Sequence, residues 1–121
     1  MIKNSIVLVP FPFDDFSSVK VRPVVCLTSE IGRYKHVVVA FISSNISNYN
    51  ENLDILIKKD SDLNKNTGLL VNSVIKIHRI TTIPKHLIKR RLGTITPKLS
   101  NKIYSNLAQL FEIDKYLNNE T

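Results

Sequence analysis

Arg22 and Pro23 are the two residues of this chain best suited to hold a charge in a fixed place. Proline fixes its own φ at about −65° and favours an extended conformation in the residue before it. The apolar residues 24–27 follow and predict a strand, with Pro23 as its first residue or at an edge position. A guanidinium held in this way is well suited to bind a phosphate. The alternative is that Arg22 is a surface residue paired with Asp14 or Asp15.

Ser43 comes directly after residues 37–42, an apolar run that predicts a central strand. A hydroxyl at the end of a strand is well placed to donate a hydrogen bond to a phosphate oxygen. The alternative is a serine that starts a loop by capping a turn with its side chain. The residue type allows both interpretations.

Other polar residues are weaker candidates. Lys89, Arg90 and Arg91 form a cationic run, which is either a solvated patch or a contact to backbone phosphates. His78 shares a predicted strand with Arg79, although a strand histidine is more often structural. Cys26 lies within an apolar run and is expected to be an inert buried thiol.

Metal and nucleotide cofactors are not expected. Three histidines and one cysteine occur without the spacing of a zinc site, and adjacent carboxylates such as Asp14 and Asp15 are usually solvated. The three glycines do not form a phosphate-binding loop. We therefore predict no metal and no cofactor.

The composition predicts one globular domain over residues 1–121, since 43% of the 121 residues are hydrophobic and 22% are charged. The apolar runs are much shorter than the roughly 20 residues that cross a bilayer, and the N-terminus does not resemble a signal peptide. We therefore expect a cytoplasmic protein with no membrane contact. A net charge of +7 allows a nucleic-acid partner but does not require one.

The elements that must position these residues are short strands and one helix. Strands are predicted over residues 6–9, 24–28, 37–42, 53–57, 74–83 and 92–95, with a loop over residues 10–21 and a helical turn over residues 84–88. Thr96 and Pro97 predict the start of an amphipathic helix that runs to about residue 117. Its apolar face consists of Leu99, Ile103, Leu107, Leu110 and Phe111. This order indicates a mainly β fold, a small barrel or curved sheet with one C-terminal helix.

Several of these segments, taken in order, resemble the MazF/PemK family of bacterial toxins. The matching segments are IVLVPFPF from Ile6, KVRPVV from Lys20, FISSN from Phe41, GL from Gly68 with NSVI from Asn72, and LGTI from Leu92. Together they extend over about residues 3–112.

The resemblance implies an SH3-like barrel and a homodimer that is neutralised by a cognate antitoxin, with operator DNA as a further partner through the antitoxin. It also implies a metal-independent endoribonuclease that cuts single-stranded mRNA. In that reaction the ribose 2′-OH attacks the adjacent phosphate and leaves a 2′,3′-cyclic phosphate. The family's arginine falls on Arg22, and its strand-end threonine falls on Ser43. The candidate substrate contacts around these two catalytic residues are Phe13, Lys20, Pro23, Ser44, Asn45, His78 and Arg79.

The sequence departs from the family pattern at three places. Ser43 replaces a threonine, Asn4 and Ser5 replace Gly-Asp, and His78 and Arg79 stand where many relatives carry an acidic residue and Gln or Lys. Two other functions remain open at this stage. One is a toxin of the same fold that poisons DNA gyrase by binding, and the other is an inactive member that binds RNA or its operator.

Overall fold

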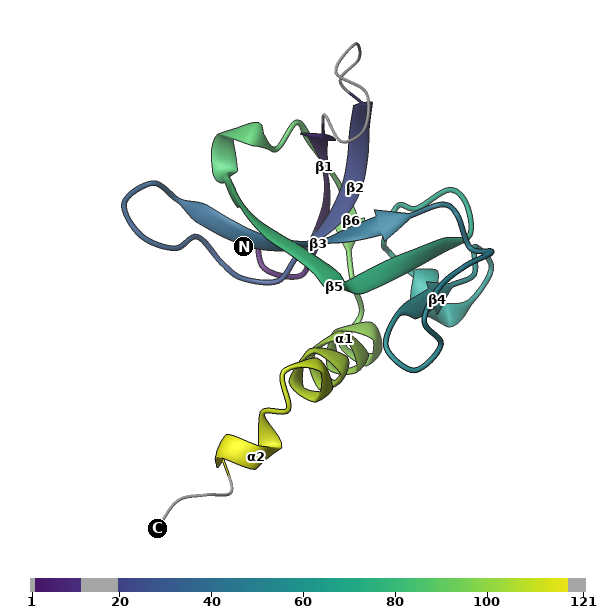
Figure 1. The fold of residues 1–121 in the computed structure, drawn as a ribbon. Coiled ribbons are helices and arrows are strands. Elements are labelled where there is room, and N and C mark those ends of the chain that lie inside the picture. Colours follow the sequence, from purple (N-terminus) through teal and green to yellow (C-terminus); the bar gives the residue numbers. More distant parts are fainter. Residues whose placement is uncertain (1, 12–19, 118–121) are drawn as a thin grey trace.

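Six antiparallel strands form one curled sheet, a half-barrel, in the order β4-β5-β3-β2-β1-β6 (Figure 1). The computed structural model describes residues 2–11 and 20–117. The strands are β1 (Ser5–Phe11), β2 (Lys20–Cys26), β3 (His36–Ser43), β4 (Ile55–Ile57), β5 (Ser73–Pro84) and β6 (Arg90–Thr94). The predicted fold class, a small β barrel with a C-terminal helix, is confirmed.

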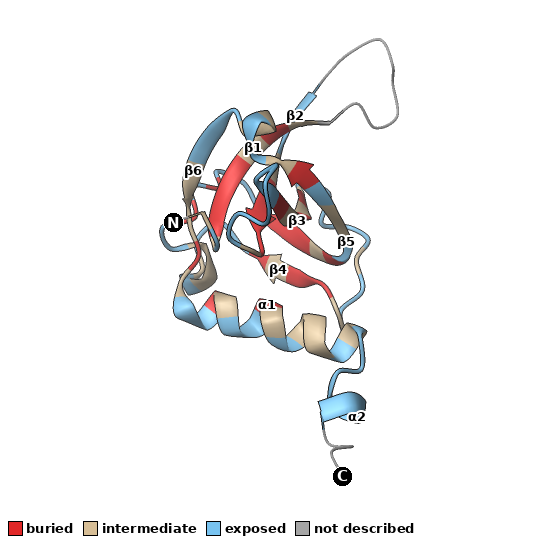
Figure 2. Ribbon diagram, turned by 90° about the vertical axis from the view of Figure 1, so that its left-hand side faces the viewer, coloured by how far each residue is buried: buried red, intermediate tan, exposed pale blue. Residues whose placement is uncertain are grey.

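The main helix, α1 (Pro97–Leu110), lies below the sheet in Figure 2. The Thr96 side chain accepts a hydrogen bond from the Leu99 N–H at 3.3 Å, and Pro97 occupies the first turn, so the predicted helix start is confirmed. Two short 3₁₀ helices, η1 (Asp62–Asn64) and η2 (Lys85–Leu87), connect strands. None of the described helices is long and apolar enough to span a membrane.

The predicted helix to residue 117 is wrong at its C-terminal end. The helix ends at Leu110 with Phe111 as its C-cap, and Glu112 has a left-handed φ of 54°. The Ile113 N–H bonds to the Ala108 carbonyl at 2.9 Å and the Glu112 N–H to the Gln109 carbonyl at 3.1 Å, the pattern of a Schellman motif. A separate short helix, α2 (Asp114–Leu117), follows. Because the left-handed residue is a glutamate and not the usual glycine, the sequence gives no stop signal here.

The sheet carries two clusters of buried apolar side chains, one on each face, and Figure 2 shows the buried residues along its strands. The first core lies between the sheet and α1 and contains Ile6, Val25, Leu27, Ala40, Ile42, Ile55, Ile57, Leu69, Ile75, Ile77, Ile95, Leu99 and Ile103. The second core is on the other face and contains Val7, Val9, Val24, Cys26, Val37, Val39 and Ile83. Because side chains alternate along a strand, residues two apart share a face, which places Arg22 on the same face as Val24.

The loop predicted over residues 10–21 is too long at both ends. Pro10 pairs with Val21 and Phe11 with Lys20, so β1 and β2 extend into it, and Pro23 lies within β2 opposite Leu8 and not at its start. Both prolines are tolerated because each lies where its strand has only one neighbour. The pairing of β1 with β6 ends at Leu8, and that of β2 with β3 begins at Val24.

The remaining strands lie close to their predicted positions, with two exceptions. β4 is shorter than predicted, because residues 53 and 54 lie in the turn before it. β6 begins at Arg90, so two residues of the cationic run belong to an edge strand of the sheet. The predicted helical turn after β5 is present as η2.

Candidate functional site

Arg22 lies on the exposed part of β2, opposite Val9 of β1. Its side chain is on the face of the second core, because it is two residues from Val24. The predicted alternative partners, Asp14 and Asp15, lie outside the described residues. Among the described residues, no ion pair involves Arg22.

Ser43 is the half-buried last residue of β3. Its Oγ accepts a hydrogen bond from the Asn45 N–H at 3.1 Å, which is the turn-capping role expected of a serine that starts a loop. This bond uses the oxygen as an acceptor. It does not use the hydroxyl hydrogen, which a phosphate oxygen could accept.

The strand register places Arg22 and Ser43 at equivalent positions on one face, two residues past the last pair of the β2–β3 ladder. Val24 pairs with Phe41 in the antiparallel β2–β3 ladder, so continuing that register by two residues puts Arg22 opposite Ser43. Residues that face each other across two strands share a face of the sheet. The ladder ends at Val24 and Phe41. Arg22 and Ser43 therefore lie just beyond its end, where the two backbones no longer bond to each other.

Arg79 reaches the same region from β5. In the β3–β5 ladder Ala40 pairs with Ile80 but Phe41 pairs with Lys76, so the ladder skips residues 77–79, which form a bulge. β5 bends sharply there (Figure 1). The guanidinium carbon of Arg79 lies 5.0 Å from the centroid of the Phe41 ring, a cation–π contact. Phe41 is two residues before Ser43 on the same face of β3.

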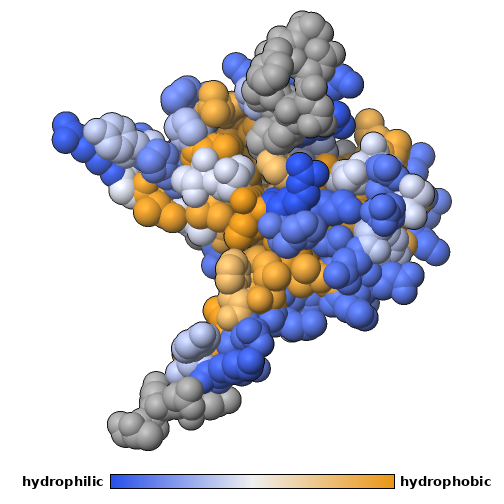
Figure 3. Space-filling model, in the orientation of Figure 1, coloured by the Kyte–Doolittle hydropathy of each residue, from blue (hydrophilic) through white to orange (hydrophobic). Residues whose placement is uncertain are grey.

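His78 is also exposed in this bulge. The side-chain alternation expected along a regular strand does not hold here, because the bulge interrupts it and leaves both His78 and Arg79 exposed after the buried Ile77. Both His78 and Arg79 face solvent, and Figure 3 shows a hydrophilic surface over the crossing of β3 and β5.

The other candidate substrate contacts have different surroundings. Lys20 is exposed at the start of β2, and Pro23 is half-buried within it. Ser44 is exposed, and Asn45 is exposed with its Oδ1 accepting hydrogen bonds from the Ser47 N–H at 3.1 Å and hydroxyl at 2.7 Å. Phe13 lies outside the described residues.

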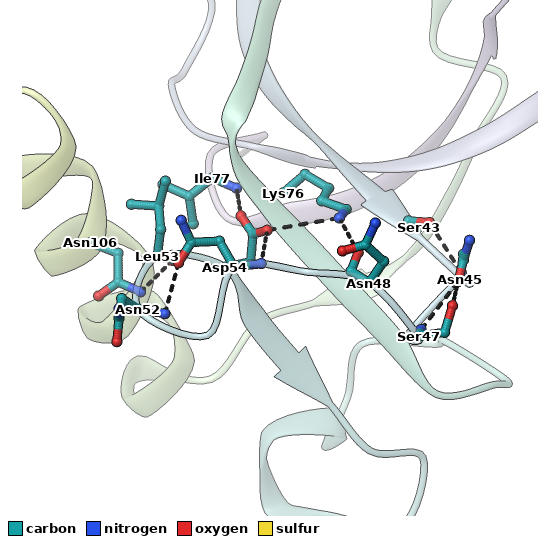
Figure 4. A network of polar contacts seen from close by, with 11 residues as sticks. Ser43, Asn45, Ser47, Asn48, Asn52, Leu53, Asp54, Lys76, Ile77 and Asn106 are labelled. Carbon is teal, nitrogen blue, oxygen red and sulfur yellow. Dashed lines mark hydrogen bonds and ion pairs between the residues drawn. The ribbon is translucent and has the colours of Figure 1, made fainter.

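Asp54 is the polar residue that the sequence interpretation missed. In the strand predicted over residues 53–57 a charged side chain is expected on the solvent side, but Asp54 is only 5% exposed. Its carboxylate bonds to backbone N–H groups and lies 3.8 Å from Lys76 Nζ (Figure 4). The available signal for its burial was a single acidic residue within the otherwise apolar segment 53–57. The same pattern also fits an exposed aspartate on a half-buried strand.

A cavity of about 380 Å³ opens on the Arg22 face, beside Val7 of β1. Its lining residues are Ile2, Ser5, Val7, Glu30, Lys85, Ile88 and Arg91. Lys85 pairs with Glu30 at 2.5 Å, and this hydrogen bond lowers the pKa of the Glu30 carboxyl. Arg91 supplies a further cation from the run at residues 89–91. No group of three or more His, Cys, Asp or Glu suited to a metal occurs within the described ranges.

Cys26 is fully buried in the second core, and burial raises the pKa of its thiol from 9.0 to about 11. Only the thiolate reacts with alkylating agents, so at about pH 8 we expect iodoacetamide to modify native Cys26 at least about 100-fold more slowly than an ordinary thiol. Mass spectrometry of native and urea-unfolded protein would measure both rates. Equal rates would contradict the buried position of this thiol.

Solved structures with the same fold include a bacterial toxin and a bacterial endoribonuclease. The chain superposes on the Mycobacterium tuberculosis toxin MazF-mt6 with a TM-score of 0.66 and 21% identity, over 89% of this chain and 96% of that one. A mycobacterial endoribonuclease in complex with its cognate antitoxin gives a TM-score of 0.69 and 14% identity, over 93% and 95% of the two chains. No curated protein sequence matches the chain at a significant level. The family model of the PemK-like, MazF-like toxins of type II toxin–antitoxin systems matches residues 3–111, and the chain belongs to this family.

Proposed function

We propose that this toxin is a metal-independent endoribonuclease that cleaves single-stranded mRNA, with Arg22 and Ser43 as its catalytic residues. The β2–β3 register supports this most directly, since its continuation beyond Val24 and Phe41 would set Arg22 opposite Ser43 on one face of the sheet. Similar structures include proteins described as endoribonucleases.

The reaction transfers a phosphoryl group within the RNA. The ribose 2′-OH attacks the adjacent phosphorus and loses its proton, the bond from phosphorus to the 5′-oxygen breaks, and that oxygen receives a proton. The products are a 2′,3′-cyclic phosphate and a free 5′-OH. Negative charge gathers on the non-bridging oxygens in the transition state, where a preorganised cation is most effective.

The two residues would contribute in different ways. The planar guanidinium of Arg22 can donate two parallel hydrogen bonds to the phosphate oxygens, and it can also hydrogen-bond to the leaving 5′-oxygen. A guanidinium stays protonated at any physiological pH and is a poor general base, so charge stabilisation is the main role. The Ser43 hydroxyl would donate to a phosphate oxygen.

The surrounding residues would hold the RNA. The candidates are Arg79, which contacts the Phe41 ring, and the exposed residues His78, Lys20, Ser44 and Asn45. Cations at such positions bind phosphates, and polar side chains read base edges. We include Phe13 and Pro23 as contacts from the β1–β2 connection and from β2.

Partner and assembly proposals follow from the family. We propose that a cognate antitoxin neutralises this chain, because a similar toxin was solved with its antitoxin and because a net charge of +7 favours an acidic segment. We further propose a cytoplasmic homodimer whose complex with the antitoxin binds operator DNA. Light scattering of the free protein would measure the oligomeric state.

The reaction is tested with purified protein and a long single-stranded RNA in the presence of EDTA. Cleavage that survives EDTA, with 2′,3′-cyclic phosphate ends in mass spectrometry, is the expected result. RNA left intact while DNA gyrase becomes trapped on DNA would decide for a gyrase poison instead. RNA bound but not cleaved would indicate an inactive member.

Ser43→Ala is expected to lower kcat about tenfold, the effect of one lost hydrogen bond to a charged group. Ser43→Thr keeps the hydroxyl and should retain activity. Rates on a short fluorescent RNA under saturating conditions would measure this.

Ser61→Ala is the matched control, because its Oγ donates only to the Lys58 carbonyl in a polar turn far along the chain. It should leave kcat unchanged. Full activity in Ser43→Ala would remove Ser43 from the mechanism.

A further inference from the structure

We infer that Asp54 is a positioning residue for the RNA-binding surface, holding both the β5 bulge that carries His78 and Arg79 and the loop that follows Ser43. This inference rests on the proposed function. The Asp54 side chain is only 1% exposed, so it acts through other residues and does not touch RNA itself.

The first contact fixes the bulge. Asp54 Oδ1 accepts a hydrogen bond from the buried Ile77 N–H at 3.1 Å (Figure 4). Ile77 is the first of the three residues of β5 that the β3–β5 ladder skips. The β4–β5 ladder ends at Ile55 and Ile75, so the carboxylate supplies an acceptor just beyond the last backbone pair. The next two residues of the chain are His78 and Arg79.

The second contact fixes the loop between β3 and β4. Asp54 Oδ2 accepts from the Asn50 N–H at 3.1 Å, while the Asp54 N–H donates to the Asn50 carbonyl at 2.7 Å. This reciprocal pair closes the turn at the end of residues 44–54. Ser44 and Asn45 lie at the start of the same segment.

Lys76 joins the two parts. Its Nζ lies 3.8 Å from Asp54 Oδ2 and donates to the Asn48 carbonyl at 3.1 Å. Figure 4 shows the resulting row of polar groups, which extends from Ile77 through Asp54 and Lys76 toward Asn45 and Ser43. One buried carboxylate thus makes contacts with both segments that carry candidate RNA contacts.

A neutral amide cannot replace this carboxylate. The two oxygens accept from two different backbone N–H groups, and an amide would turn a donor toward one of them. It would also remove the charge beside Lys76. Asp54→Asn keeps the size of the side chain, so the change is confined to these contacts.

The test compares Asp54→Asn with Asp62→Asn, an exposed aspartate in η1, using steady-state cleavage of a short RNA. Misplaced RNA contacts weaken binding, so KM should rise about tenfold in Asp54→Asn, which is the effect of losing roughly one base contact. The kcat of this variant should stay within about threefold of the wild-type value. Asp62→Asn should match the wild type. In hydrogen exchange, the Ile77 amide should lose protection while the Ile75 amide keeps it.

Lys76→Met is the second variant in case Asp54→Asn does not fold. It keeps the bonds of Asp54 to Ile77 and Asn50 and removes only the contacts of Lys76 to Asp54 and to the Asn48 carbonyl, so KM should rise by a smaller factor. An unchanged KM in the folded variants, or a loss confined to kcat, overturns the inference.

Failure of the proposed function is recognised separately. If the wild type binds RNA without cleaving it, the proposed reaction is wrong, and the dissociation constant for that RNA then tests Asp54. A weaker affinity in Asp54→Asn supports the inference, and an equal affinity overturns it.

Discussion

Arg22→Ala is expected to lower kcat for RNA cleavage by about 10²–10³-fold, the usual effect of removing one preorganised donor to a developing negative charge. The side chain is exposed at a strand position beyond the end of the β2–β3 ladder, so its loss should leave folding intact. Single-turnover cleavage of a defined RNA would measure the rate, and the melting temperature would verify the fold.

Two further variants make this result specific. Arg33→Ala removes an exposed arginine in the turn between β2 and β3 and should cleave at the wild-type rate. Arg22→Lys keeps the charge but not the planar fork of donors, and its rate should lie between those of wild type and Arg22→Ala. Wild-type cleavage by Arg22→Ala would refute the site assignment, even if the protein proves to be a ribonuclease.

Gly93→Ala is expected to lower stability by about 3 kcal/mol, because β6 leaves no space for a side chain at this position. A Cβ added to Gly93 would overlap the Asn66 carbonyl and lie 2.6 Å from the Thr67 carbonyl oxygen. The Asn66 carbonyl also accepts the Thr94 N–H at 2.8 Å, so the backbone cannot move away without losing that bond. Thermal unfolding should show a melting temperature lower by about 10 °C.

Gly32→Ala is the matched control for this prediction. Gly32 has a φ of 73° but open space around its Cα, so the cost there is only that of a left-handed backbone, about 1 kcal/mol. If Gly93→Ala is no less stable than Gly32→Ala, the close approach between β6 and residues 66–67 is wrong.

The sequence was sufficient to identify most elements of the fold. Apolar β-branched runs predicted the strands, because burial on a sheet requires such side chains wherever the strand pairs. Thr96 and Pro97 marked the helix start, because the backbone N–H groups of the first turn have no partner within the helix. The threonine side chain accepts a hydrogen bond from one of them, and proline has no N–H to satisfy. These signals are local, so they can be read without knowing what the segment contacts.

Asn4 shows how a departure from the family pattern can be neutral for the fold. The family resemblance implies glycine at this position, and Asn4 has a φ of 71°, a left-handed conformation that asparagine tolerates better than most residues. Its side chain also lies 2.9 Å from the Tyr104 hydroxyl of α1. The substitution therefore fits the local backbone and adds a contact to the helix.

Element ends and special positions depended on tertiary context. The predicted β1 and β2 were too short, because proline is not expected inside a strand that has neighbours on both sides. The sequence does not show that β1 at Pro10 and β2 at Pro23 have a neighbour on one side only. The break after Phe111 uses a glutamate with a left-handed φ, which no local rule predicts. The helix face was correct for Leu99 and Ile103, but Phe111 is 54% exposed beyond the sheet.

The candidate site was likewise predicted only in part from the sequence. The sequence by itself determined that a permanent cation stands beside a proline before an apolar run, and that a hydroxyl ends a central strand. Only the tertiary structure decided that Arg22 and Ser43 lie on the same face beyond the end of the β2–β3 ladder, that a bulge interrupts β5 at His78 and Arg79, and that Asp54 is buried. The physical reason is that register, bulges and burial depend on pairing between distant segments, such as Asp54 with Ile77, 23 residues away.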